Sequence, residues 1–240
     1  MHRLRVLPPF AVLLSLAFSA QALAGDFDIE TPDQDAFGDV AKDITAALNY
    51  KALGPAEPSG LSGFSIGMFG SYVPVENEDA WETLTGDEPG EIGMAGISVS
   101  KGLPFGVDVG AFYSAVPGTD GSLFGAELRY AVWKGGIASP AVAVRASYSK
   151  LSGVDDIDYD STGLDVSISK GFTLLTPYAG AGMVFGTVDA ADEFGLDKED
   201  VDVGRFFAGV RMTLGFMALT PEYEHVGDND VFSLRVSLGL

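Results

Sequence analysis

Apolar residues recur at every second position along most of this chain, and this alternation constrains its fold more than any other feature. It runs in ten segments between Phe64 and Leu240, which are separated by clusters of glycine, proline, aspartate and asparagine. A period of two is the spacing of a β-strand, whose successive side chains point to opposite faces. Most segments are near the length of about 9 to 11 residues with which a tilted strand crosses the hydrocarbon of a membrane. We therefore predict an all-β fold, a closed antiparallel transmembrane β-barrel of about ten strands.

The links between the predicted strands alternate between long and short. Long acidic links follow odd-numbered strands, as in residues 75–91, 150–160 and 188–202. Short links, such as residues 102–104 and 170–172, follow even-numbered strands. Long links then lie at one rim of the barrel and short links at the other. This asymmetry is typical of bacterial outer-membrane barrels, which have short periplasmic turns and long external loops.

The first 24 residues have the features of a secretory signal peptide. A basic start precedes an apolar run from Val6 to Phe18, and Ala22-Leu23-Ala24 is a small-residue cleavage site. The apolar run is shorter than the roughly 20 residues that a membrane-spanning helix needs. The pattern predicts export, with residues 1–24 removed.

A second helical pattern lies between the signal peptide and the first strand. From Asp33 to Tyr50, apolar residues such as Phe37, Val40 and Ile44 fall at helical spacing. We predict one amphipathic helix, at the periplasmic end of the barrel or partly plugging its lumen. The predicted parts are a signal peptide (1–24), an N-terminal periplasmic or plug segment with one helix (25–60) and the outer-membrane β-barrel (61–240).

The composition excludes several classes of function. A net charge of −20 argues against direct binding of nucleic acid and favours cationic partners. The chain has no cysteine, which excludes disulfides, thiolate metal sites and a cysteine nucleophile. Hydrophobic residues make up 47% of the chain, too many for a disordered protein of this charge.

Alternation alone does not decide whether the apolar face meets lipid or a protein core, since a secreted or periplasmic soluble β-domain alternates too. The other face is mostly small residues with scattered charges, which is typical of a lumen rather than of a sheet face in water. Aromatic residues on the apolar face form two groups, as expected at the two interfaces of a bilayer. They are Tyr72, Tyr113, Tyr148 and Tyr223 at the loop ends, and Phe64, Phe105, Tyr130 and Phe216 at the turn ends. These features favour the membrane barrel.

Two sets of residues resemble known outer-membrane proteins. The last strand resembles the terminal strand that the barrel assembly machinery recognises, although such strands usually end in Phe or Trp. Its alternating residues are Phe232, Leu234, Val236, Leu238 and Leu240. A family of uncharacterised proteobacterial outer-membrane β-barrel proteins, small barrels like OmpA and OmpX in architecture, is similar to this chain at residues 48–50, 55–58, 60, 63–64, 66–67 and 176–182. The resemblance implies an outer-membrane location, with outer-membrane lipid, lipopolysaccharide and the assembly machinery as expected partners, and it brings no activity.

Charged residues at lumen positions allow two interpretations. They could line a narrow pore for small solutes, or they could pair with one another and close the lumen. A ten-stranded barrel is only slightly wider than the eight-stranded kind whose side chains fill the interior, which favours closure. The lumen charges are Glu127, Arg129, Arg145, Asp165, Arg205, Arg211, Glu222, Glu224 and Arg235.

The residues offer little for catalysis. His225 lies near Glu222, Glu224 and Ser233 in sequence, and a barrel enzyme acting on lipid or peptide could use such groups. However, His225 has the opposite strand parity to both glutamates, and no nucleophile motif accompanies it. We therefore predict a structural or surface protein that is not an enzyme, with the narrow channel and the barrel enzyme as alternatives.

Carboxylates in the long links suggest one further site. Asp192, Asp197, Glu199 and Asp200 surround Gly195 and offer the hard oxygen ligands that Ca²⁺ or Mg²⁺ prefers. The alternative is a solvated, soluble rim. No other cofactor is expected.

Overall fold

The computed structural model describes residues 29–115 and 121–239, and its strands form one closed antiparallel barrel. Each strand pairs with its neighbours in the chain, and β1 pairs with β10 to close the ring, with Tyr72 opposite Phe232. The strands are β1 (Phe64–Pro74), β2 (Glu91–Gly102), β3 (Val107–Ala115), β4 (Ser122–Trp133), β5 (Ala141–Ser152), β6 (Ile157–Ser169), β7 (Leu175–Ala190), β8 (Glu199–Leu214), β9 (Met217–Val226) and β10 (Asn229–Gly239). The predicted ten-stranded barrel is confirmed. The predicted signal peptide lies outside the described residues.

The two rims of the barrel differ as the link lengths predict. The loop rim carries helix α3 (Glu78–Thr85) after β1 and the short 3₁₀ helix η2 (Asp192–Phe194) after β7. The turn rim carries the 3₁₀ helix η1 (Pro104–Gly106) and the short links after β4, β6 and β8. The predicted third strand is wrong at its start, because Phe105 lies in η1 with a φ of 66° and β3 begins only at Val107.

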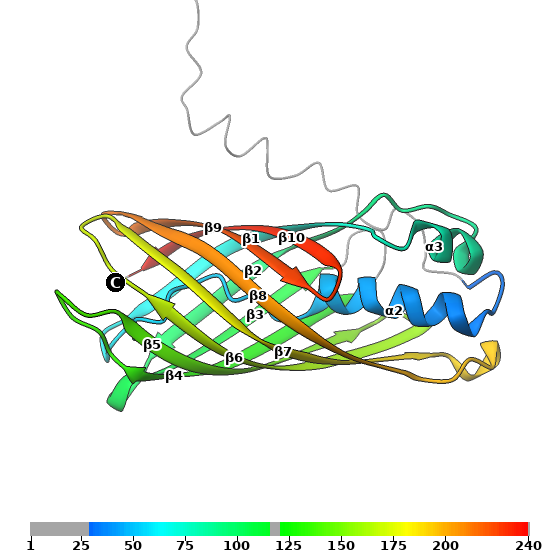
Figure 1. Cartoon of the computed structure of the whole chain (residues 1–240), viewed down its shortest axis with the longest axis horizontal. Coiled ribbons are helices and arrows are strands. Elements are labelled where there is room, and N and C mark those ends of the chain that lie inside the picture. The colour runs from blue at the N-terminus through cyan, green and yellow to red at the C-terminus, as the bar shows by residue number, and fades with distance from the viewer. Residues whose placement is uncertain (1–28, 116–120, 240) are drawn as a thin grey trace, which may run out of the picture.

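The predicted helix is helix α2 (Gln34–Leu48), which begins after the N-cap Asp33, whose side chain accepts a hydrogen bond from the Ala36 amide. It lies at the loop rim beside α3, at the opposite end of the barrel from the C-terminus (Figure 1). Helix α2 therefore does not lie at the turn end, and it packs inside the loop end of the ring against β7, β8 and β10, which agrees with the alternative of a partial plug. The physical reason is the segment 49–63, which contains no helix or strand and runs from α2 to the start of β1 at the turn rim, past Arg205 and Asp108 of the wall. We call residues 29–63 the N-terminal arm.

Strands β6, β7 and β8 extend beyond the predicted boundaries, and residues 157–160, 188–190 and 199–202 are strand rather than loop. The period of two continues there, but the inward residues are apolar and the outward residues are polar, the reverse of the rest of each strand. Inward-facing Tyr159, Val188 and Val201 are buried and belong to one hydrophobic core with α2 and α3. Outward-facing Asp158, Asp160, Asp189, Asp200 and Asp202 are exposed. We call this loop-rim part of the barrel the collar.

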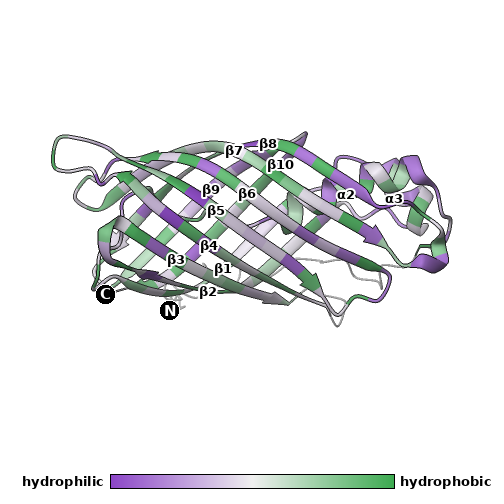
Figure 2. Cartoon of the chain, turned by 90° about the horizontal axis from the view of Figure 1, so that it is seen from below, coloured by the Kyte–Doolittle hydropathy of each residue, from purple (hydrophilic) through white to green (hydrophobic). Residues whose placement is uncertain are grey.

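Below the collar, hydrophobic residues alternate with polar ones along the strands (Figure 2), and the hydrophobic side chains are the exposed ones. We call these outward residues the belt, and each is between 41% and 59% exposed. They are Ile66, Met68, Ile97, Val99, Tyr113, Leu128, Val144, Leu164, Val166, Ile168, Met183, Phe206, Val236 and Leu238. No helix among the described residues is long and apolar enough to cross a membrane.

Candidate functional site

A network of buried charges fills the middle of the lumen, and Asp165 on β6 lies at its centre. Arg145 on β5 donates to Asp165 Oδ2 from Nε at 2.9 Å and from Nη2 at 2.7 Å. Arg205 on β8 donates from Nε to Asp165 Oδ1 at 2.6 Å and pairs with Oδ2 through Nη2. All three residues are at most 5% exposed. One carboxylate thus holds two guanidinium groups, the charge-assisted geometry that suits arginine.

A glycine makes this arrangement possible. Arg145 is directly opposite Asp165 in the ladder, but Arg205 is two strands away, with Gly182 of β7 between them. A Cβ at Gly182 would lie 2.5 Å from Asp165 Oδ1 and 2.0 Å from the carbonyl oxygen of Leu164. Because any side chain at 182 would collide with these atoms, only glycine lets Arg205 reach across β7.

The N-terminal arm joins the same network. Arg205 Nη1 donates to the carbonyl oxygen of Tyr50 at 2.8 Å, to Asn49 Oδ1 at 2.9 Å and to Glu224 Oε1 at 3.2 Å. Lys51 Nζ donates to the carbonyl oxygen of Ala46 at 2.6 Å and lies 3.3 Å from Glu224 Oε2. The arm is therefore fastened to the barrel wall by buried ionic and backbone contacts.

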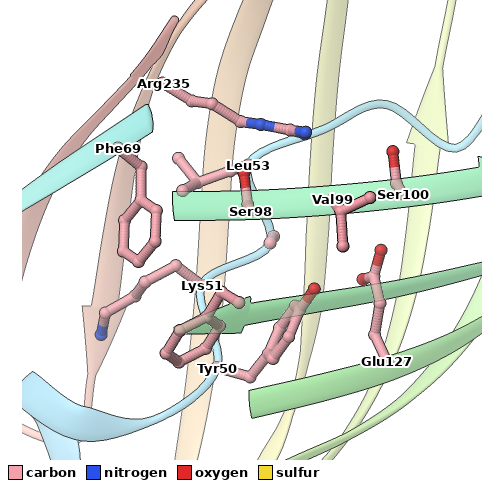
Figure 3. A pocket seen from close by; sticks show the side chains of 11 residues that line it. Tyr50, Lys51, Leu53, Phe69, Ser98, Val99, Ser100, Glu127 and Arg235 are labelled. Atoms are coloured by element: carbon pink, nitrogen blue, oxygen red, sulfur yellow. The ribbon is translucent and has the colours of Figure 1, made fainter. Parts of the chain in front are cut away.

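Aromatic rings pack around these charges. The Arg145 guanidinium lies 5.2 Å from the Phe207 ring centre and 5.9 Å from that of Tyr50, distances at which a cation is attracted to a ring. Beside them, Tyr50, Lys51 and Leu53 of the arm face Glu127 and Arg235 of the wall across a cavity of about 30 Å³ (Figure 3). A cavity of this size holds about one or two waters, so that the arm and the wall leave little free space beside Tyr50 and Lys51.

The arm is also held at both rims. At the loop rim, the buried Asp43 of α2 accepts hydrogen bonds from Trp81 Nε1 at 3.0 Å, Asn77 Nδ2 at 2.9 Å and Asn229 Nδ2 at 2.7 Å. At the turn rim, the amide of Ser59 donates to Asp108 Oδ1 at 2.9 Å. The arm is thus bound along its whole path through the lumen.

The structure distributes the predicted lumen charges over two levels. Glu127 lies 3.6 Å from Arg145 and joins the central network, and Glu222 accepts a hydrogen bond from Tyr178 Oη at 2.6 Å. Arg129, Arg211 and Arg235 lie further toward the turn rim, where Arg129 is 3.2 Å from Asp108. Sequence reasoning missed Lys51 and Asn49, because the arm has no period that points them at the wall. Asp108 was detectable, because it has lumen parity on β3.

The groups considered for catalysis are separated. His225 Nδ1 lies 2.8 Å from Asp230 Oδ1 on the outer face, where both side chains are partly exposed. Ser233 is buried on the inner face and shares a hydrogen bond with Ser71. The barrel wall therefore stands between the histidine and the serine.

The predicted cation site is not assembled. Among the described residues, no three acidic or histidine side chains are grouped in a way that could hold a metal ion. Glu199 instead accepts a hydrogen bond from Gln34 of α2, and Asp200 lies 3.5 Å from Lys198. Residues 199 and 200 lie on β8, where consecutive side chains point to opposite faces, so that Glu199 and Asp200 do not face one another.

No family model and no curated protein matches this chain. Among solved structures, Ail, the attachment invasion locus protein of Yersinia pestis, is 15% identical with a TM-score of 0.36, over 74% of this chain and 95% of that chain. The outer membrane protein OprG from Pseudomonas aeruginosa is 11% identical with a TM-score of 0.36, over 78% and 97%. The β domain of the Bordetella autotransporter BrkA is 11% identical with a TM-score of 0.47, over 74% and 98%. The chain is similar to outer-membrane barrels, the class that its sequence resembles, and the likeness concerns the fold alone.

Proposed function

We propose that this chain is an integral protein of the bacterial outer membrane, that its own N-terminal arm closes its lumen, and that its role is structural or at the cell surface, without catalysis. The observation that carries the proposal is the arm, which passes through the whole barrel and is bound by Arg205, Glu224 and Asp108. A conducting pore would require these buried contacts to break. The separation of His225 from Ser233 supports a role without catalysis.

The belt supports membrane insertion. A ring of side chains such as Leu164, Val166 and Ile168 in contact with water is unfavourable by about 25 cal/mol for each Å² of apolar surface. A bilayer removes that contact, and a closed barrel satisfies its backbone hydrogen bonds within hydrocarbon. The acidic collar then lies in water beyond the belt. In barrels of this kind the longer loops face the outside, which places the collar and α2 at the cell surface.

Single cysteines test the path of the arm, because the natural chain has none. Thr31→Cys is at the loop rim and Ser62→Cys is at the turn rim, and both positions are exposed. On intact cells, we expect a membrane-impermeant maleimide to label position 31 and to label position 62 only after lysis. Labelling of 62 alone on intact cells would reverse the orientation, and labelling of neither after lysis would contradict the exposure of both ends.

Conductance tests closure of the lumen. The mature protein in planar lipid bilayers is expected to show no single-channel steps. Stable steps at low voltage would favour the narrow channel instead. Recovery of the mature protein as a detergent-free periplasmic monomer would exclude the membrane barrel altogether.

A further inference from the structure

Three arginines gather at the turn side of the lumen, below the central network. The guanidinium groups of Arg129 and Arg211 both approach Gly54 of the arm, where a Cβ would lie 3.7 Å from Arg129 Nη1 and 3.0 Å from Arg211 Nη2. Arg235 is the third member, and it lines the same small cavity as Leu53, the residue before Gly54. Three positive charges therefore share one enclosed region.

Few negative charges balance them. Asp108 lies 3.2 Å from Arg129 and also accepts the Ser59 amide. Among the described residues, Arg211 and Arg235 have no carboxylate within ion-pair distance. Arg235 Nη2 has only the hydroxyl of Ser65, at 3.2 Å.

The neighbouring carboxylates are engaged elsewhere. Glu127 pairs with Arg145, and Glu222 accepts the Tyr178 hydroxyl. Glu57, at the turn rim, accepts the amide of Gly171 at 3.1 Å. None of these carboxylates lies within ion-pair distance of Arg211 or Arg235, which leaves both guanidinium groups without a paired anion in the described part of the chain.

The three side chains also have unused donors. Nε of Arg129, of Arg211 and of Arg235 is buried with no hydrogen-bond partner among the described residues. Arg129 and Arg235 are each only 7% exposed. A guanidinium cannot lose its proton to relieve its burial, and an uncompensated buried charge is strongly destabilising. Among the residues that the structure describes, Arg211 and Arg235 thus lack a paired anion, and the Nε donors of all three arginines lack acceptors.

We propose that Arg129, Arg211 and Arg235 bind a small oxyanion of the phosphate class at the turn side of the lumen. The forked donors of arginine match the paired oxygens of such an anion, which would satisfy charge and hydrogen bonds together. Arg211 is the most exposed of the three and is three residues from the end of β8, so that the anion enters from the turn rim. Inorganic phosphate and a phosphate-bearing lipid headgroup share this chemistry.

Calorimetry on the mature protein, in a maltoside detergent without phosphate, tests the site. Titration with inorganic phosphate at constant ionic strength is expected to give a saturable heat that sodium chloride does not give. Parallel titration with glycerol 3-phosphate separates the sources, because preference for it assigns a headgroup and preference for inorganic phosphate assigns the free ion. Absence of a saturable heat with both compounds overturns the proposal.

Variants locate the binding. Arg211→Gln is expected to weaken phosphate binding about tenfold or more, the equivalent of roughly 1.4 kcal/mol. Lys150→Gln, which removes one exposed positive charge at the collar, is the matched control and should bind as the natural chain does. Gly54→Val keeps all three arginines and adds a branched side chain at a position where a Cβ would already lie 3.0 Å from Arg211 Nη2, and it should also abolish binding. If Arg211→Gln does not fold, Gly54→Val decides alone, and unchanged binding in the folded variant rejects this location.

Discussion

The collar and the centre of the lumen are built from the same strands and the same alternation, yet their interiors are opposites. In the collar, Tyr159, Val188 and Val201 turn inward onto α2, and aspartates turn outward. In the centre, Arg145, Asp165 and Arg205 turn inward, and the belt turns outward. The outside medium explains the difference, because apolar side chains turn away from water and have no such preference beside lipid. The collar is thus organised as a soluble barrel, and the centre is organised as a membrane barrel.

The largest effect is expected at the centre. Asp165→Ala leaves Arg145 and Arg205 without their shared carboxylate, and breaking such a buried pair lowers stability by up to about 5 kcal/mol. The loss of stability is measured on gels, where the band of the folded barrel should be absent from unheated samples or should disappear at a lower temperature than in the natural chain. Asp160→Ala, on the outer face of the same strand, is the control and should behave as the natural chain does. Equal behaviour of the two variants would mean that the network does not stabilise the barrel.

A core residue of the collar should behave differently. Phe37 of α2 is fully buried, and Phe37→Ala removes packing worth about 3 kcal/mol. Since Phe37 packs in the collar core, we expect protease cleavage near α2 while the barrel keeps its heat-dependent gel mobility. Joint loss of both would show that the collar and the barrel unfold as one unit.

Substitutions on the outer face of β6 test the position of the boundary between water and lipid. Leu164→Arg places a charge in the belt and should make insertion less favourable by about 2 to 3 kcal/mol. We therefore expect less of this variant in the outer membrane. Asp160→Leu, four residues nearer the loop rim, changes an exposed position and should alter stability by only about 0.5 kcal/mol. Fractionation of both variants measures the difference. A normal yield of Leu164→Arg would place the membrane boundary elsewhere.

The smallest effect concerns the contact between the two helices. Trp81→Phe keeps the ring and removes one of the hydrogen bonds to Asp43, which should reduce local stability by about 1 kcal/mol. Faster hydrogen exchange confined to residues 78–85 is the expected readout. Exchange that rises throughout the barrel would contradict a local role for this contact.

The sequence predicts the number of strands, because a period of two persists whichever face is apolar. The ends of β6, β7 and β8 were not predictable in the same way. Asp158, Asp160 and Asp200 lie at positions where the rest of each strand has outward apolar residues, so that their polarity is typical of a loop. Only the structure shows that in the collar the outer face is the polar one. Between the belt and the collar, the apolar side chains change from the outer to the inner face of the strand. Periodicity does not indicate the residue at which this change occurs.

The lumen positions of Arg145, Asp165 and Arg205 follow from parity, but their partners do not. The contact between Arg205 and Asp165 depends on Gly182, and a glycine-rich strand gives no clear parity from its sequence. The contact between Arg205 and Tyr50 depends on the path of the arm. Helical spacing predicts α2 itself, but nothing in residues 49–63 indicates which rim the helix reaches.

The path of the arm sets an order of events during assembly. The pairing of β1 with β10 closes the ring of strands around residues 49–63. Helix α2, with its buried side chains, blocks the loop rim of that ring. A finished ring would have to admit this helix end-on through a lumen lined by paired charges. The arm must therefore be in place before the ring closes, and the barrel forms around it.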